Sequence, residues 1–290
     1  MTAMRTSRVP RRTFRMPGWV LLVAPVLAIL LALYVLPVAS IFTESFLVDG
    51  KVSLGNYTGF FGTEQYVGIL LRTFLFALVA TLLCGVLAYP YAFLLTRVTG
   101  RLKIVLVALV LVPFWTSMLA RTYAWLVLLQ DNGPVQAFLQ SLGITVPLLR
   151  SPAGVLIGMV QILLPFMVLP LYNTMSGIDR RLLHAAETLG ANKLKAFVKV
   201  YFPLSLPGLM SGGIIVYVLS LGFYVTPAIL GSPQTSLLSQ LIVQEISQRL
   251  DWGSAGAMSV ILVVLTLAFL ALAARFLNLR SIFSNSEGDR

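Results

Sequence analysis

Charged residues are scarce in this sequence. They make up 11% of the 290 residues, whereas hydrophobic residues make up 58%. A soluble domain has about 25% charged residues. A chain of this length could bury a sizeable core, but it has too few charges to cover the outside of one. Lipid must therefore solvate much of its surface, which predicts an integral membrane protein and excludes a soluble enzyme.

Cysteine and histidine are almost absent as well. The one cysteine, Cys84, excludes an intrachain disulfide and a cysteine-based metal site, and we expect it to be buried in packing. With His184 as the one histidine, most catalytic sites of hydrolases are excluded. No glycine-rich phosphate loop ending in Lys-Ser or Lys-Thr is present. We predict no catalytic residue, no metal and no cofactor, and no ATP hydrolysis by this chain through such a loop.

Long apolar runs are what the sequence has in abundance. A helix needs about 20 apolar residues to cross a hydrocarbon core of about 30 Å, and Arg121 is the only charge inside any of the runs. Pro203, Pro207 and the turn at 231–233 trim the fifth run to one span. The prediction is an all-α, polytopic membrane protein, a single domain over residues 1–290 with about six transmembrane helices. The six runs are residues 16–43, 73–96, 104–129, 151–178, 209–230 and 252–274.

Basic residues gather in alternate connections. The segments 1–15, 97–103, 179–199 and 275–290 hold 16 of the 21 Lys and Arg residues. Cytoplasmic loops carry this excess, so both ends are predicted to be cytoplasmic, as a basic tail at 1–15 and a polar tail at 279–290. The net charge of +11 is then a signal of topology that faces membrane lipid, not the footprint of a nucleic-acid binder.

The N-terminus also resembles a secretory signal. Arg11 and Arg12 precede an apolar run, and residues 37–40 could serve as a cleavage site. The run is longer than a typical signal core, however, and five more apolar runs follow it. We therefore expect an uncleaved first helix.

The connection at 178–208, between the fourth and fifth runs, contains the most informative pattern. Residues 181–189 should form a short helix that ends at Gly190, which can supply a left-handed turn. A second helix, stopped by Pro203, should place Leu194, Phe197, Val198 and Tyr201 on one face. Such a pair could dock into a partner's groove or lie on the lipid headgroups, and its physical pattern alone favours the headgroups.

This connection resembles the EAA loop of binding-protein-dependent ABC importer permeases, which couples the membrane subunit to its ATPase. His184 stands where that family usually has Glu, and Thr188 stands where Asp is common, while Glu187 still offers a carboxylate. The resemblance implies that His184 and Glu187 act in coupling together with the matched positions. Those are Ala185, Ala186, Leu189, Gly190, Ala191, Phe197, Pro203, Pro207 and Gly208.

Further segments resemble the spermidine/putrescine branch of the family, which includes opine and phosphonate transporters. They are residues 54–57, 113–117, 121–125, 164–172 and 222–231. The resemblance implies a type I importer permease in the bacterial inner membrane that forms half of the pathway for a small solute. Polyamine is the first choice, and an opine, phosphonate or amino-acid-like compound is the alternative. The implied partners are a second permease, two cytoplasmic ATPase subunits and a periplasmic binding protein.

The pathway candidates are one cation and several aromatic residues. Arg121 should lie near the outer interface, where it either reaches for the headgroups or lines a vestibule. The runs contain no Asp or Glu, so carboxylates for a polyamine would have to come from the second permease. That absence also counts against a secondary transporter, the rival class together with a structural membrane subunit. The candidates are Trp115, Arg121, Tyr123, Trp125, Tyr172, Phe223 and Tyr224.

Overall fold

The structure is a computed structural model that describes residues 18–144, 146–179 and 181–277. The predicted tails at 1–15 and 279–290 and the paired arginines Arg11 and Arg12 lie outside these residues. Within the described part, five helices are long and apolar enough to cross a membrane, or six if one sharply bent pair counts as a single span. The five are α1 (Gly18–Glu44), α3 (Glu64–Arg97), α7 (Pro152–Ser176), α10 (Phe202–Leu221) and α13 (Trp252–Leu277).

The third apolar run is not one helix. It forms α4 (Gly100–Leu111), a 3-10 turn η1 (Val112–Trp115) and α5 (Met118–Leu128), and the chain bends by 103° between the two arms. Pro113 has no N–H to continue the helix, Thr116 is extended, and Ser117 also leaves the helical region with φ −56° and ψ 133°. The third predicted span, 104–129, is therefore a broken span: it counts as the sixth only if the bent pair is taken as one.

The fifth span begins earlier than predicted. The chain runs from α9 (Lys193–Ala196) through a π-helical turn η2 (Phe197–Tyr201) directly into α10. Pro203 lies in the first turn of α10, where a missing N–H is tolerated. The Phe202 N–H bonds to the Phe197 carbonyl, five residues back, so the wider turn accommodates the proline. The prediction that Pro203 stops the helix is wrong, and α10 ends at Leu221 before the predicted limit of 230.

Short elements connect the spans. After α1 come the antiparallel strands β1 (Leu47–Val48) and β2 (Lys51–Val52), with Leu47 opposite Val52, and then α2 (Gly55–Gly62). The helix α6 (Pro134–Ser141) follows α5, and α8 (Arg181–Thr188) precedes α9. After α10 come α11 (Val225–Leu230), the 3-10 turn η3 (Pro233–Thr235), α12 (Leu238–Gln244) and the π-helical turn η4 (Glu245–Arg249).

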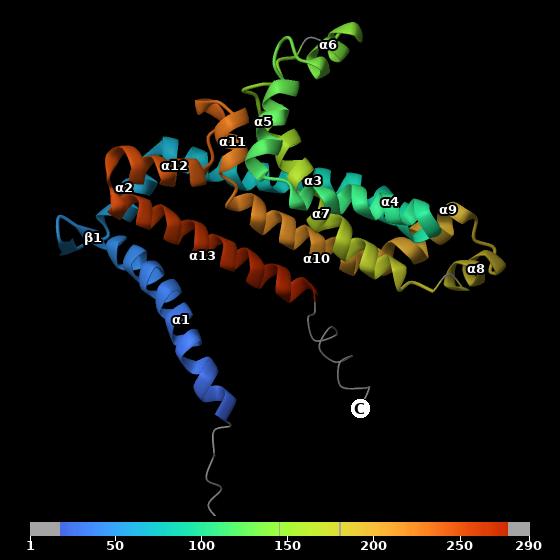
Figure 1. The fold of residues 1–290 in the computed structure, drawn as a ribbon, viewed down its shortest axis with the longest axis horizontal. Coiled ribbons are helices and arrows are strands. Elements are labelled where there is room, and N and C mark those ends of the chain that lie inside the picture. The colour runs from blue at the N-terminus through green and yellow to red at the C-terminus, as the bar shows by residue number, and fades with distance from the viewer. Residues whose placement is uncertain (1–17, 145, 180, 278–290) are drawn as a thin grey trace, which may run out of the picture.

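The core lies where α3, α7 and α10 pack together (Figure 1). Small side chains at helical spacing on α3 are fully buried there: Ala77, Ala80, Cys84, Ala88 and Ala92. Small residues allow membrane helices to approach closely. The expected burial of Cys84 is confirmed, with its sulfur 3.8 Å from the Val160 carbonyl.

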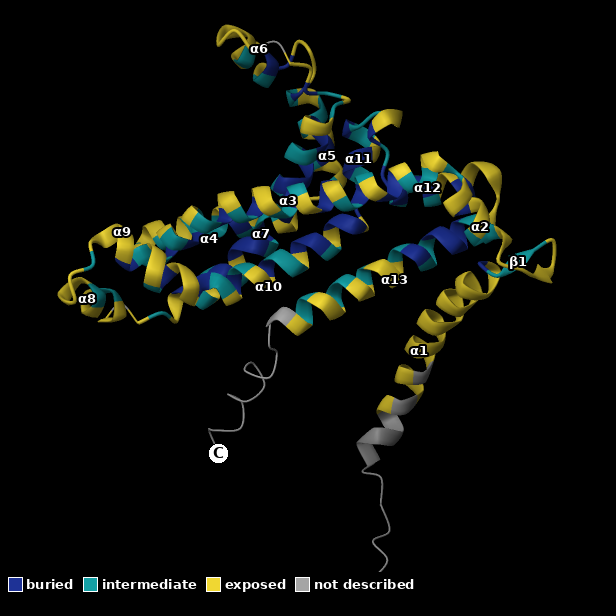
Figure 2. Cartoon of the chain, turned by 180° about the vertical axis from the view of Figure 1, so that it is seen from behind, coloured by how far each residue is buried: buried dark blue, intermediate teal, exposed yellow. Residues whose placement is uncertain are grey.

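The helix α1 stands apart from this core. It contacts α13 near its C-terminal end and diverges from the rest of the molecule towards its N-terminal end (Figures 1 and 2). Its described side chains are exposed almost throughout, and Leu33 and Leu36 are 68% and 67% exposed. An apolar surface of this kind requires lipid or another membrane subunit to cover it.

Two adjacent glycines of α10 offer a test of the core. A Cβ at Gly212 would lie 2.9 Å from the Met167 sulfur and 3.1 Å from the Met167 carbonyl oxygen, whereas a Cβ at Gly213 would lie 3.7 Å from the Thr81 methyl group. Overpacking costs about 1–3 kcal/mol, while Gly→Ala gains about 0.5–1 kcal/mol of helix propensity. We expect Gly212→Ala to lower the unfolding midpoint in detergent and Gly213→Ala to keep or raise it. Equal shifts in the two variants would contradict this packing.

Candidate functional site

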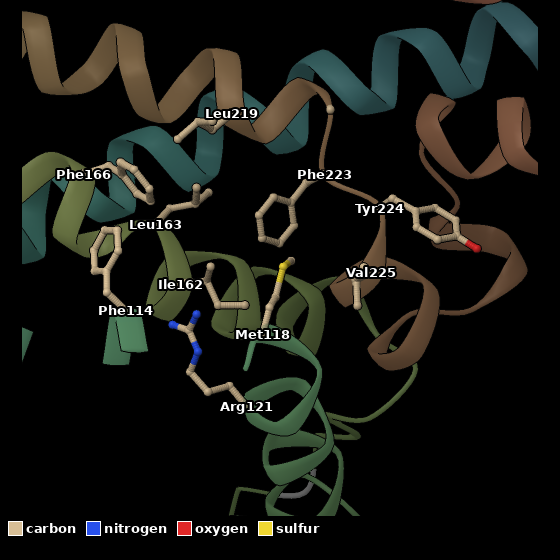
Figure 3. A pocket seen from close by; sticks show the side chains of 11 residues that line it. Phe114, Met118, Arg121, Ile162, Leu163, Phe166, Leu219, Phe223, Tyr224 and Val225 are labelled. Carbon is tan, nitrogen blue, oxygen red and sulfur yellow. The ribbon is translucent and has the colours of Figure 1, made fainter. Parts of the chain in front are cut away.

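A cavity of about 460 Å³ lies where two helix interruptions meet (Figure 3). One interruption is the bend between α4 and α5, and the other is the gap between α10 and α11. The unbroken helix α7 forms the wall between them. The lining residues are Phe114, Met118 and Arg121 from the first, Ile162, Leu163 and Phe166 from α7, and Leu219, Gly222, Phe223, Tyr224 and Val225 from the second.

Backbone polar groups explain why the interruptions gather here. Hydrocarbon offers no hydrogen bonds, so non-helical backbone at membrane depth is tolerated only inside protein or beside a water-filled cavity. At the second interruption the Ser239 hydroxyl donates to the Phe223 carbonyl at 2.7 Å. At the first, the Thr116 N–H bonds to the Pro113 carbonyl at 3.2 Å. Both breaks are therefore stabilised by hydrogen bonds of their own and form part of the cavity wall.

The two broken segments are held together directly. The hydroxyls of Thr122 on α5 and Thr226 on α11 lie 3.3 Å apart, and both side chains are fully buried. Gly158 on α7 makes room for this pair, since a Cβ there would lie 2.5 Å from the Thr226 methyl group. The geometry of the cavity thus depends on a contact among α5, α7 and α11.

Arg121 is the only charged residue among the described residues that line the cavity. Its guanidinium extends into the space between Phe114 and Ile162 (Figure 3). Its Nε atom is buried and has no hydrogen-bond partner in the described part of the chain. No carboxylate lines the cavity, and the one buried carboxylate among the described residues, Glu245, pairs elsewhere with Arg249 at 2.8 Å. The cavity can therefore offer donors and a positive charge, surrounded by apolar and aromatic surface.

The seven predicted pathway residues divide into two groups. Arg121, Phe223 and Tyr224 line the cavity, although Tyr224 turns its ring away from the others (Figure 3). The other four do not line it: Trp115 is 90% exposed, Tyr123 is exposed, Trp125 packs against the core, and Tyr172 lies beneath the Lys103 ammonium. Sequence reasoning missed Phe114, Met118 and Phe166, and Phe114 and Phe166 lie inside segments that carried the family resemblance.

The loop around Gly190 has the predicted break. Gly190 has φ +88°, its N–H bonds to the Glu187 carbonyl at 3.0 Å, and the Ala191 N–H bonds to the Ala186 carbonyl at 3.0 Å. This pair of bonds is the Schellman ending of a helix. Asn192 then begins α9 by accepting the Lys195 N–H at 2.8 Å. Two short helices separated by a left-handed glycine are confirmed.

The apolar face of the second helix is divided, contrary to prediction. Phe197 and Tyr201 stack with ring centroids 5.6 Å apart and turn inward to pack on Phe93. Leu194 and Val198 remain exposed. The π-helical turn η2 begins at Phe197 and changes the helical register, so these residues do not share one face.

The predicted coupling residues occupy two different settings. His184 and Ala185 are exposed on α8, and Leu189 beside Gly190 is 89% exposed, at one end of the molecule (Figure 1). His184 Nδ1 lies 3.6 Å from the Glu187 carboxylate. By contrast, Pro203, Pro207 and Gly208 lie within α10, where Gly208 packs against Leu171 and Thr174 of α7. Ala186 and Ala191 are half-buried.

Comparison with known proteins identifies relatives over most of the chain. Residues 96–281 match the family described as "Binding-protein-dependent transport system inner membrane component". The spermidine/putrescine transport system permease protein PotB of Escherichia coli (strain K12) is 35% identical over 215 residues, which cover 73% of this chain and 78% of PotB.

Two solved structures are similar in fold. One is a bacterial ABC transporter involved in the import of the acidic polysaccharide alginate, with a TM-score of 0.76 and 15% identity, covering 90% of this chain and 96% of that chain. The other is the bacterial alginate ABC transporter in complex with an alginate pentasaccharide-bound periplasmic protein, with a TM-score of 0.69 and 16% identity, covering 91% and 95%.

Access of water to the cavity can be tested with cysteine chemistry. The native Cys84 is fully buried, so we expect thiol reagents to label the unmodified chain little or not at all. Met118 lines the cavity, whereas Leu78 is exposed on α3 and lines none of the described pockets. We expect Met118→Cys to react with a small charged thiol reagent in membranes, and Leu78→Cys to stay unreactive. Equal labelling of both variants, or of neither, would contradict a water-filled cavity.

Proposed function

This chain belongs to the family of inner membrane components of binding-protein-dependent transport systems, and we propose that it forms one half of the pathway for a small solute in an ATP-driven importer. As a member of the family it is a multi-pass permease subunit of the inner membrane. The observation that supports a pathway here is the cavity at the two helix breaks, which joins irregular backbone, aromatic surface and one cation.

The rest of the importer is proposed from the family to which the chain belongs. Two separate ATPase subunits supply the energy, and a periplasmic binding protein delivers the solute. A second permease completes the pathway. The arm formed by α5 and α6 is an argument for a second permease. It projects from the bundle (Figure 1) and exposes the apolar residues Phe138, Leu142 and Ile144, which a partner subunit would cover. The alginate transporter provides a precedent for a docked periplasmic protein.

The orientation follows from the distribution of basic residues. With 16 of the 21 Lys and Arg residues in alternate connections, both termini and the loop at 178–208 face the cytoplasm. The exposed end of that loop, from His184 to Ala191, is then the surface that contacts the ATPase. Its exposed Leu189, which water disfavours, suits a groove of the partner subunit.

Polyamine is the first candidate solute. It is supported by the 35% identity to a spermidine/putrescine permease, and aromatic rings in the cavity suit a cationic solute. The carboxylates that a polyamine requires then come from the second permease. Arg121 favours a second candidate, a solute with a carboxylate or phosphonate group such as an opine or amino-acid-like compound, because a guanidinium binds such groups with paired hydrogen bonds.

Neutralising Arg121 distinguishes the two candidates. If the solute is spermidine, Arg121→Gln should leave uptake unchanged or raise it, since a repulsive charge is lost. If the solute is anionic, the same change should lower uptake about tenfold or more, because hydrogen bonds to charged groups contribute about 1.5–3 kcal/mol. Uptake and binding by the co-purified periplasmic protein are the measurements, with spermidine expected to bind. A binding protein that binds neither class of solute would overturn both candidates.

Gly190 tests the coupling role of the loop. At φ +88° a valine would cost about 1–3 kcal/mol, whereas asparagine tolerates this conformation. A Cβ at Gly190 meets nothing within 4 Å, so the backbone alone is perturbed. We expect Gly190→Val to abolish uptake and the ATPase response to loaded binding protein at normal expression, and Gly190→Asn to retain both.

The assay uses the complete complex purified from membranes, with expression level as the control for folding. Normal uptake by Gly190→Val would show that the loop is not the coupling element and instead lies on the headgroups. A reporter fused after Asn192 that proves to be periplasmic would overturn both the orientation and this role.

A further inference from the structure

A second pocket, separate from the cavity, lies at the end of the molecule that carries α8 and α9 (Figure 1). Its volume is about 170 Å³, and its lining comes from the end of α3, α4, the end of α7, Ile178, α8 and η2. One water needs about 10–15 Å³ of such volume, so the pocket has room for several waters. It is large enough for a small polar group and smaller than the cavity of about 460 Å³.

Two cations line this pocket, and neither has an acidic partner. Among the described residues, no carboxylate lies within ion-pair distance of Arg97 or Lys103. The Arg97 guanidinium lies over the Phe93 ring at 4.8 Å, and the Lys103 ammonium lies over the Tyr172 ring at 5.3 Å. The aromatic faces hold the charges in place but leave their N–H groups available to an anion.

A buried donor in the same pocket lacks an acceptor. Tyr201 is only 4% exposed, and its buried hydroxyl has no hydrogen-bond partner among the residues that the structure describes. Its ring is fixed by stacking on Phe197 and by an edge contact with Phe93. Leaving a buried hydroxyl unpaired costs free energy, so a structure that keeps one beside two unpaired cations is suited to an acceptor from outside the chain.

We propose that this pocket binds a phosphate group, and that an anionic phospholipid headgroup supplies it. Phosphate offers several strong acceptor oxygens, which a guanidinium, an ammonium and a phenol can share. Basic pockets between membrane helices at the interface bind lipid headgroups in this way. The exposed apolar side chains of Ile104 and Val105 continue along α4 from the pocket and give acyl chains a surface to follow.

Occupancy of the pocket would also stabilise the position of α8. Ile178, on the segment before α8, and Leu183, on α8 itself, line the pocket together with residues of α3 and α4. A bound phosphate therefore ties the exposed loop to the membrane-embedded helices. The inference needs only that the chain is embedded in a membrane, so it stands or falls independently of the transported solute.

The test compares lipid retention by the purified complex in nanodiscs of phosphatidylcholine with and without phosphatidylglycerol, measured by native mass spectrometry. We expect retained phosphatidylglycerol, and about fivefold weaker retention in Lys103→Gln, the factor expected for one basic residue near a membrane surface. Arg101→Gln is the matched control, because Arg101 is an exposed cation two residues away that does not line the pocket. Equal losses in both variants, or no retention by the unmodified complex, would overturn the proposal.

Tyr201→Phe provides a second, independent readout. Removing the unpaired hydroxyl should keep or raise the unfolding midpoint in phosphatidylcholine alone and should reduce the stabilisation that phosphatidylglycerol gives. An unchanged response to phosphatidylglycerol would contradict a role for Tyr201. A parallel sample with inorganic phosphate in phosphatidylcholine distinguishes the sources. Protection by free phosphate equal to that by the lipid would support the phosphate site and assign it to an anion from solution.

Discussion

Backbone hydrogen bonding is the constraint on which the rest of this structure depends. A chain in hydrocarbon must satisfy its own N–H and C=O groups, so it can leave the helix only where protein or a cavity surrounds it. Here two such exceptions meet at one cavity: Gly222–Tyr224 line it, and the break at Thr116–Ser117 is flanked by Phe114 and Met118, which line it as well. The Thr122–Thr226 contact, for which Gly158 leaves space, holds the two exceptions together. The apolar cavity wall and the irregular backbone are therefore two consequences of one requirement.

Close packing of α3, α7 and α10 makes that cavity rigid. Alanines at helical spacing on α3 and the glycines Gly208 and Gly212 on α10 let these two helices approach α7 closely. Among the described side chains of α1 none is buried, and the surface that they form is leucine-rich. The chain thus divides into a tightly packed centre that defines the site and an outer helix that only lipid or another subunit can cover.

Local chemistry and hydropathy predicted much of this from the sequence. The apolar runs identified five of the long helices, and Gly190 predicted the left-handed helix ending that φ +88° confirms. Hydropathy could not predict the 103° bend, because an apolar run reports depth in the membrane and not direction. Pro203 was misread because its effect depends on the π-helical turn before it. The same π-helical turn points Phe197 and Tyr201 inward, and no residue pattern in the sequence predicted that turn.

The cavity and the exposed loop are connected by two rigid helices. α7 lines the cavity at Ile162–Phe166 and ends at Ser176, about 15–20 Å further along, just before α8. α10 returns from the loop at Phe202 and, after about 30 Å, ends at Leu221 beside the cavity. The glycine contacts that lock α7 to α10 prevent one helix from sliding past the other without a steric clash. A displacement of the loop is therefore expected to move both cavity walls together, which is the mechanical property that the proposed coupling to an ATPase requires.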